Sequence, residues 1–231
     1  DKIFGRGTID DKGPAIACLY AMKAVLDSGV KLNKKVRIIY GLNEESGWEC
    51  MKHYFKKEKP TTLAFTPDAD FPAIHGEKGI IIFDLAKNLT SAFEGEGVRV
   101  LSMKGGNRPN MVPDYCEAHV NFTASLAHAL EEYKKSHDVA LEIEENKDKA
   151  IIKSFGVSSH GSLPEHGVNA ISQLMMFLNS LALAKGEVSD FIKFYCDKIG
   201  MEYYGQSIGC GLSDIESGKL IFNVGIIDLN E

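Results

Sequence analysis

The chain has 231 residues, of which 44% are hydrophobic and 25% are charged, a balance typical of a folded globular protein and not of a disordered one. Its 26 Lys and Arg against 32 Asp and Glu give a net charge of −6, without a polybasic run. The composition therefore lacks the electrostatic footprint of a protein that binds nucleic acid or an anionic membrane surface. We expect a small-molecule or peptide ligand.

The five cysteines are odd in number, widely scattered and free of any C-x-x-C pair. This pattern argues against a disulfide framework and against a cysteine zinc knot, and it predicts a reducing, cytoplasmic setting. No apolar run approaches the ~20 residues that a membrane-spanning helix needs.

Two helices are predicted near the start of the chain. Residues 13–29 fit a helix, because Pro14 suits the first turn, mostly apolar or helix-forming residues follow, and Gly29 is a stop signal. The near-continuous apolar character predicts that this helix is largely buried. Residues 48–59 read as an amphipathic helix that ends before Pro60.

Two short apolar runs, 36–42 and part of 61–72, predict strands that alternate with these helices. This order implies an α/β fold in which crossover helices join a parallel sheet, and such sheets bind ligands at the carboxyl ends of their strands. Three acidic loops are expected at that edge. Their acidic residues are Asp10, Asp11, Glu44, Glu45, Asp68 and Asp70.

From residue 74 onward the pattern becomes α+β. Strands are predicted within 76–87, 97–104, 114–124, 140–146 and 149–156, and helices within 125–136 and 169–184. We therefore place a domain boundary near Pro72 to Ile74, which divides the chain into residues 1–73 and 74–231.

The stretch "GRGTIDDKGP" allows several interpretations. A phosphate loop is disfavoured, because Lys12 is followed by a glycine instead of Ser or Thr and is preceded by two anions. Asp10 or Asp11 could instead cap the following helix. The adjacent Glu44 and Glu45 favour a cation site, because like charges raise one another's pKa unless a cation compensates them.

The motifs "GRGTIDDKGP", "GLNEESGWE" and "TPDADFP", in this order, resemble the M20 family of zinc metallopeptidases and, within it, the PepV-like dipeptidases. The resemblance implies part of a zinc-exopeptidase catalytic domain in residues 1–73. It also implies an α+β lid domain with ferredoxin-like elements in residues 74–231.

The resemblance further implies a site with two zinc ions. It assigns Asp10 as the carboxylate that bridges both metals, and Glu45 and Asp68 as ligands of one metal each. Glu44 resembles the general base that takes a proton from the zinc-bound water. Asp11 and Asp70 are left with capping or supporting roles.

Two segments of the implied lid also match. In "GVSSHGSLPEHGVNA", His160 resembles the lid histidine that stabilises the oxyanion of the tetrahedral intermediate, although an isolated histidine in such a loop is otherwise solvated or packed. In "NMVPD", Asn110 resembles a residue that contacts the substrate, and the alternative is a plain turn before a strand.

The resemblance also places several site residues outside this chain: an upstream H-x-D motif, a terminal zinc histidine and a lid arginine. Each metal would keep two of its ligands here, so we expect the chain alone to bind zinc weakly and to hydrolyse nothing. Manganese or cobalt would suit such a site as well as zinc. Because the sheet of residues 1–72 would be incomplete, the lid is expected to fold more reliably.

Three functions follow from these patterns. The leading hypothesis is a fragment of a di-zinc dipeptidase that hydrolyses short peptides. The second keeps the fold and changes the substrate to N-acyl amino acids, such as succinylated diaminopimelate. The third is a non-catalytic module whose acidic loops hold a structural cation or cap helices.

Overall fold

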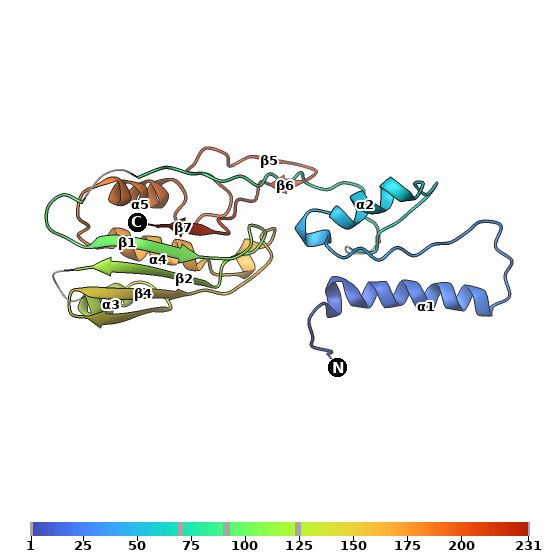
Figure 1. Cartoon of the computed structure of the whole chain (residues 1–231), viewed down its shortest axis with the longest axis horizontal. Coiled ribbons are helices and arrows are strands. Elements are labelled where there is room, and N and C mark those ends of the chain that lie inside the picture. Colours follow the sequence, from blue (N-terminus) through green and yellow to red (C-terminus); the bar gives the residue numbers. More distant parts are fainter. Residues whose placement is uncertain (1, 69–71, 90–92, 123–125, 231) are drawn as a thin grey trace. The chain divides into compact units, whose positions relative to one another are not determined.

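The computed structural model describes residues 2–68, 72–89, 93–122 and 126–230. The chain forms two compact units, Asp1–Glu77 and Lys78–Glu231, and each is described by itself. Figure 1 labels their helices and strands. No helix within these described ranges combines the length and the apolar character needed to cross a membrane.

The first unit contains two α-helices, α1 (Gly13–Asp27) and α2 (Glu49–Lys57). Both confirm the helices predicted there. Two short helical turns precede them, η1 (Thr8–Lys12) and η2 (Glu44–Ser46). Helix α1 has Pro14 in its first turn and is followed by Gly29 at φ +75°, a backbone conformation that favours glycine at the end of a helix.

The strands predicted in the first unit do not form. Residues 36–42 and the described part of 61–72 carry no strand, and neither do the described residues of 76–87 in the segment that follows. A strand exists only where its N–H and C=O groups pair with a neighbour. These apolar runs have no such neighbour among the described residues, so the parallel sheet expected here is absent from the unit.

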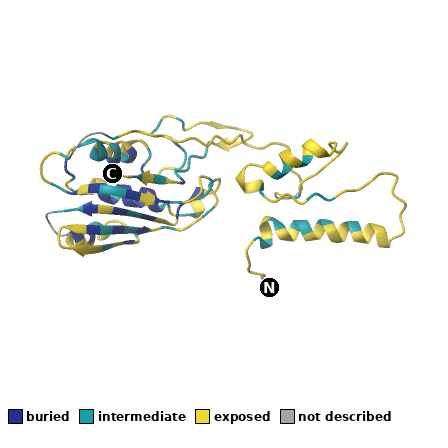
Figure 2. Ribbon diagram, viewed as in Figure 1, coloured by how far each residue is buried: buried dark blue, intermediate teal, exposed yellow. Residues whose placement is uncertain are grey.

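Helix α1 is also less buried than predicted. Neither α1 nor α2 contains a buried residue, and the side chains of Leu19 and Leu26 are 41% and 61% exposed. Figure 2 shows the contrast with the blue interior of the second unit. The apolar surface of α1 lacks a packed layer to cover it.

The second unit is built on an antiparallel sheet of five strands, in the order β3-β4-β2-β1-β7. The strands are β1 (Arg99–Gly105), β2 (Tyr115–Asn121), β3 (Leu141–Asn146), β4 (Lys149–Phe155) and β7 (Ile227–Leu229). The first four confirm predicted strands. A separate pair consists of β5 (Ser213–Asp214) and β6 (Gly218–Lys219).

The helices of this unit are α3 (Leu126–Lys134), α4 (Ala170–Ser180) and α5 (Glu187–Lys198), with a short turn η3 (Pro164–His166). Helices α3 and α4 confirm predictions. Helix α4 packs against β2 and β4, and its fully buried Phe177 and Leu174 meet the inward face of the sheet, where Ile152 and Ala118 are also fully buried. This core anchors the loops that carry the candidate site residues of the unit.

Candidate functional site

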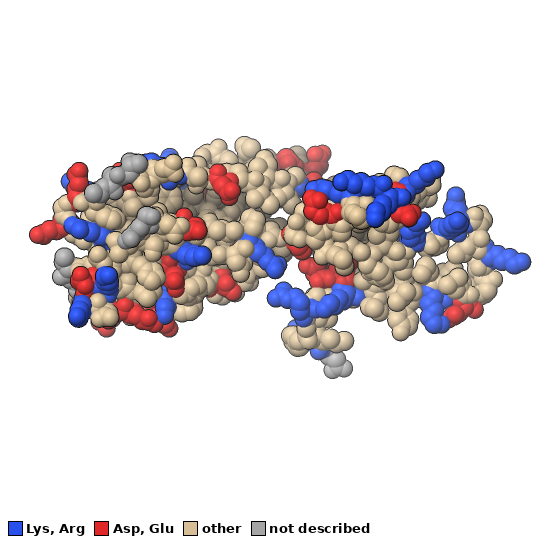
Figure 3. Space-filling model, viewed as in Figure 1, with Lys and Arg blue, Asp and Glu red and all other residues tan. Residues whose placement is uncertain are grey.

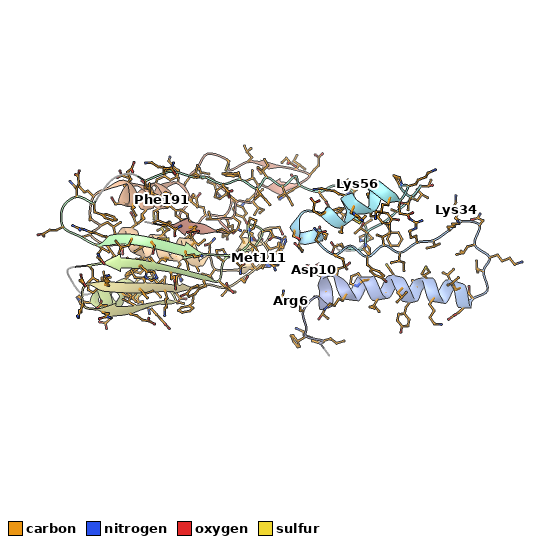
Figure 4. The ribbon with its side chains drawn as sticks, viewed as in Figure 1. Arg6, Asp10, Lys34, Lys56, Met111 and Phe191 are labelled. Atoms are coloured by element: carbon orange, nitrogen blue, oxygen red, sulfur yellow. The ribbon has the colours of Figure 1, made fainter. Side chains whose placement is uncertain are left out.

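The first acidic loop is a compact turn that leads directly into α1. The backbone N–H of Lys12 donates to the carbonyl of Gly7 at 2.9 Å. Gly7 has φ +73°, and a Cβ there would lie 3.1 Å from the carbonyl oxygen of Asp10, so the turn favours glycine. The peptide bond between Asp10 and Asp11 is cis. Figure 4 labels Asp10 at this end of the helix.

Neither aspartate caps α1. Lys12 occupies the N-cap position, and no side chain bonds to the helix start. The capping interpretation of Asp10 and Asp11 is therefore wrong. The Oδ1 atom of Asp11 is instead buried without a hydrogen-bond partner, a costly arrangement for a carboxylate unless a donor or a cation satisfies it. Asp70, the other residue given a supporting role, lies outside the described residues.

The second acidic loop holds Glu44 and Glu45 within η2. Asn43 organises this loop, since its Oδ1 accepts from the backbone N–H of Cys50 at 3.0 Å and its carbonyl accepts from Trp48 N–H at 3.1 Å. Local hydrogen bonds of this kind are typical of asparagine in turns. They tie the start of α2 to the residue directly before the two glutamates.

The electrostatics of Glu44 link it to the other acidic loops. Burial raises the pKa of the Glu44 carboxyl, and the charges of Glu45, Asp68 and Asp10 raise it further. A hydrogen bond with the Trp48 side chain opposes the shift. Glu44 is thus surrounded by carboxylates from all three acidic loops, and each disfavours its ionised form.

The pKa of Asp68 is raised by the same two causes. Burial raises its pKa, and the charges of Asp11, Asp10 and Glu45 add to that effect, together with Glu77. The first unit therefore brings the predicted site residues Asp10, Glu45 and Asp68 near one another and near Glu44. Mutual repulsion of this kind is relieved when a cation binds between the carboxylates.

The donor set has the chemistry of a divalent-cation site, because carboxylate oxygens bind such ions and the orphaned Asp11 oxygen lies beside them. The geometry is less complete. In the part of the chain that the structure describes, no three His, Cys, Asp or Glu side chains are arranged to hold a metal ion together. The residues fit a cation in kind, and their side chains are not gathered around one point.

The remaining predicted residues, Asn110 and His160, lie in adjacent loops of the second unit. The backbone N–H of Gly161 donates to the carbonyl of Asn110 at 2.7 Å, and that of Val112 donates to the Ser159 carbonyl at 2.9 Å. A Cβ at Gly161 would lie 2.9 Å from the Asn110 carbonyl oxygen, so only glycine permits this approach. The two loops are thus joined through their backbones; Figure 4 labels Met111, which follows Asn110 in the first of them.

The side chain of His160 is exposed, and its ring lies against Ser162. Its Nδ1 lies 2.7 Å from the hydroxyl of Ser162 and 3.3 Å from the backbone N–H of the same residue. Sequence reasoning missed Ser162, and a serine two positions from a histidine in a Ser-rich loop offers no signal by itself.

Asn223 is a second residue that sequence reasoning missed. Its Nδ2 donates to the carbonyl of Met111 at 2.8 Å and to that of Pro109 at 3.2 Å, and so holds the loop that carries Asn110. Because Met111 and Asn223 are 112 positions apart, no local pattern predicts this contact.

Asn169 fixes the other end of the histidine loop, and its position could have been found. Its Oδ1 accepts from the backbone N–H groups of Ile171 and Ser172, at 3.0 and 3.1 Å, and its Nδ2 donates to the Val224 carbonyl at 2.9 Å. An asparagine directly before an apolar helix is a standard N-cap signal.

Charges on the molecule are mixed. On the face drawn in Figure 3, coloured Lys and Arg side chains of the second unit stand among Asp and Glu side chains instead of forming one basic surface. This distribution agrees with the absence of a polybasic run in the sequence.

Comparison with known families defines the class of this protein. Residues 1–138 match the model of peptidase family M20/M25/M40, and residues 144–228 match that of the peptidase dimerisation domain. The chain therefore belongs to the M20/M25/M40 peptidase family, which confirms the predicted resemblance. The sheet of the second unit takes β1 and β2 from the first matched range and β4 from the second, which also covers parts of β3 and β7.

Individual relatives are similar along the whole chain. A protein named "Putative dipeptidase" from Staphylococcus haemolyticus is 39% identical over 98% of this chain and 49% of its own length. Proteins with the same description from Staphylococcus saprophyticus and Staphylococcus epidermidis are 39% and 37% identical, over 98% and 99% of this chain and 49% and 50% of their own lengths. The chain thus spans about half the length of the curated relatives that it matches.

Proposed function

We propose that this chain is part of a di-zinc dipeptidase and supplies most of the acidic residues of its metal centre. The observation that carries the proposal is the meeting of three acidic loops in the first unit, where burial and, next to it, the neighbouring carboxylates raise the pKa values of Glu44 and Asp68. Membership of a peptidase family and relatives named as dipeptidases support the same reaction class.

In this proposal Asp10, Glu45 and Asp68 would hold the metal ions, with Asp10 contributing to both ions and Glu45 and Asp68 to one each. The ions, when bound, supply Lewis acidity that polarises the scissile carbonyl. Zinc is the proposed metal, and manganese or cobalt would suit the same oxygen and nitrogen ligands. The three residues would supply the negative charge that offsets the positive charge of the ions.

Glu44 acts as the general base. It accepts a proton from the attacking water and returns it to the leaving amine, so that the side chain is unchanged after one turnover. Burial is the first cause of the raised pKa of Glu44, and it suits this task, because a carboxylate with an ordinary pKa is a weak base at neutral pH. The Trp48 side chain that bonds Glu44 would orient the carboxylate.

The loops of the second unit contribute to substrate binding. His160 donates a hydrogen bond to the oxyanion that develops at the scissile carbonyl, and Asn110 contacts the substrate. The backbone bond between the Asn110 carbonyl and Gly161 supports their joint action, because one rigid pair of loops then carries both residues.

The chain by itself is proposed to be inactive. A zinc ion needs three or four protein ligands, and the three carboxylates here provide only two to each metal. The proposal that further ligands come from additional sequence agrees with the chain's span of about half of its relatives. Calorimetric titration of the metal-free chain with zinc should then give weak binding, and tight binding of two ions would contradict it.

The substrate is proposed to be a dipeptide in a cytoplasmic setting, the latter from the odd and scattered cysteines. A deacylase acting on N-acyl amino acids is the second candidate within the same family. A panel of dipeptides and N-acyl amino acids, given to the full-length protein that contains this chain, separates the two.

The central test is a pair of substitutions in that full-length protein. Glu44→Gln should retain its metal and lose about 10²- to 10⁴-fold in kcat, the usual contribution of a general base. Asp10→Ala should lose metal as well as activity. Glu49→Ala is the matched control, since Glu49 is an exposed glutamate of α2 that pairs with Lys52.

Metal content by atomic spectroscopy and turnover of a dipeptide are measured on the same samples. Full activity in Glu44→Gln would remove the general base from the proposal. Full metal content in Asp10→Ala would remove the bridging ligand, and with it the two-metal site.

A further inference from the structure

The hydrogen bonds of His160 fix which ring nitrogen carries its proton. The Nδ1 atom lies 3.3 Å from the backbone N–H of Ser162, and an N–H group can only donate. The Nδ1 atom must therefore act as an acceptor and carry no proton. Because a neutral imidazole has one protonated nitrogen, the proton of His160 resides on Nε2.

The hydroxyl of Ser162 strengthens this preference. It lies 2.7 Å from the same Nδ1, a distance typical of a hydroxyl hydrogen bond, and it donates because Nδ1 has only a lone pair to offer. We propose that Ser162 is a positioning residue that holds His160 as the neutral tautomer with Nε2 protonated and directed away from Ser162.

The surrounding loop keeps Ser162 in place for this role. The backbone N–H of Leu163 donates to the His160 carbonyl at 2.9 Å, and the Ser159 hydroxyl donates to the Leu163 carbonyl at 3.0 Å. The Gly161 N–H is held by the Asn110 carbonyl at 2.7 Å. The backbone of this turn is thus bonded at three points, which holds the Ser162 hydroxyl within hydrogen-bond distance of Nδ1.

The catalytic meaning of this tautomer rests on the proposed function. A histidine that stabilises an oxyanion must present an N–H to it, and the opposite tautomer would present a lone pair and repel the negative charge. By accepting from Ser162 on one nitrogen, His160 keeps its donor available on the other. The proton stays on Nε2 throughout, so Ser162 acts on orientation and protonation only.

The tautomer can be measured directly on this chain by nuclear magnetic resonance. Histidine ring nitrogens are labelled with ¹⁵N, and correlations to the ring C–H protons distinguish protonated from unprotonated nitrogens. The signals of His160 are those that disappear in His160→Gln. Spectra are recorded at a pH above which the ring signals no longer change, so that the neutral ring is observed.

In the unmodified chain Nε2 should be protonated. Ser162→Ala should lower the ratio of the Nε2-protonated to the Nδ1-protonated form about fivefold, the loss of one ordinary hydrogen bond. Ser162→Asp should reverse the preference, because a carboxylate accepts a proton from Nδ1. Ser162→Thr keeps a hydroxyl and should restore the original ratio.

The matched control is Ser158→Ala, which removes a hydroxyl of the same loop that bonds to the Val112 carbonyl instead of His160. It should leave the His160 spectrum unchanged. Protonation of Nδ1 in the unmodified chain, or an unchanged ratio in both Ser162→Ala and Ser162→Asp, would overturn the inference.

Turnover of the full-length protein then separates this inference from the proposed function. Ser162→Ala and Ser162→Asp should lower kcat in the order of their tautomer shifts, with metal content unchanged, and Ser162→Thr should restore it. If His160→Gln keeps full activity, the proposed role of His160 fails while the spectra still decide the tautomer. If His160→Gln is inactive and the Ser162 variants shift the tautomer without lowering kcat, the positioning role of Ser162 is overturned.

Discussion

The two units of this protein contain similar apolar helices in very different surroundings. Helix α1 has no buried residue, whereas α4, a shorter helix of comparable composition, buries eight of its eleven residues. The difference lies in what each helix packs against. Helix α4 lies on the sheet through β2 and β4, and α1 has no sheet to cover among the described residues of its unit.

An apolar helix sequence therefore predicts a face that must pack against another element. The helix gains stability only where such an element covers that face. Burying one large apolar side chain stabilises the folded state by about 1.5–3 kcal/mol, and the second unit buries many such side chains. The first unit holds its acidic loops together mainly through turns and local hydrogen bonds. We expect it to be the less stable of the two units. Three experiments test this difference in stability.

The largest effect is expected from truncating one apolar side chain in each unit. Phe177→Ala removes a fully buried ring that meets Tyr133 edge to face at 5.2 Å, and it should lower the free energy of unfolding by about 3–5 kcal/mol. Leu19→Ala removes a side chain that is 41% exposed and should change it by less than about 0.5 kcal/mol. Urea unfolding is followed by circular dichroism.

The single tryptophan, Trp48, adds a separate probe of the first unit through its fluorescence. A fluorescence transition at lower urea than the circular dichroism transition would match the expected order of stability. Equal losses in the two variants would mean that α1 is packed as well as α4, and would contradict the comparison.

A smaller effect is expected from the buried amide of Gln173. Its Nε2 donates to the Ser154 hydroxyl at 2.9 Å and to the Phe155 carbonyl at 3.1 Å, and its Oε1 accepts from the Ala140 N–H at 3.3 Å. Gln173→Leu keeps the volume and leaves these groups without their partner. The free energy of unfolding should fall by about 1–3 kcal/mol.

The counterpart in the first unit is Asn43→Ala, which removes the bond from Cys50 N–H to Asn43 Oδ1. It should change Trp48 fluorescence and leave unfolding of the second unit unchanged within about 0.5 kcal/mol. A shift of the second unit's transition in Asn43→Ala would show that the two units unfold together.

The smallest effect is expected in the pH dependence of unfolding, through a hydrogen bond on strand β2. The Tyr115 hydroxyl, which donates to Glu117 at 2.6 Å, lowers the pKa of that carboxyl, and His119 and Lys153 lower it further. A lowered pKa in the folded state means that the stabilisation is present above the unfolded value of about 4.3 and is lost as the pH falls through the folded value. Tyr115 itself has a pKa raised to about 12, chiefly by burial, so it remains a donor.

Glu117→Gln and Tyr115→Phe should therefore both reduce the acid dependence of unfolding below about pH 4.3. The change should stay under about 1 kcal/mol, because the Glu117 side chain is 34% exposed and solvent screens its interactions. Glu131→Gln, an exposed change on α3, is the control. An acid dependence identical in all four proteins would assign it to other carboxylates.

Much of the molecule follows from local sequence. The alternation of apolar and polar residues predicted β1 to β4, because each of these strands has one face on the core. Pro14 and Gly29 marked the ends of α1. The order of helices and apolar runs predicted that three acidic loops converge, and the raised pKa values of Glu44 and Asp68 reflect carboxylates from these loops in addition to burial.

Other features depend on partners that are distant along the chain. Residues 36–42 include several β-branched residues and were predicted to form a strand, but they do not form one. A strand needs a second segment to pair with, and the local sequence does not show whether such a segment is present. Asn223 supports the Asn110 loop across 112 positions. Ser162 is close to His160 in sequence, yet only the folded turn brings its hydroxyl to Nδ1 and not to solvent.

The sequence by itself determined the peptidase family, the helices α1 to α4 and the types of residue at the candidate site, because motifs, periodicity and charge are local properties. The tertiary structure decided which apolar faces are buried, which carboxylates interact electrostatically and which nitrogen of His160 carries the proton. Those outcomes arise from distances between atoms, and these are defined only when separate segments pack against each other.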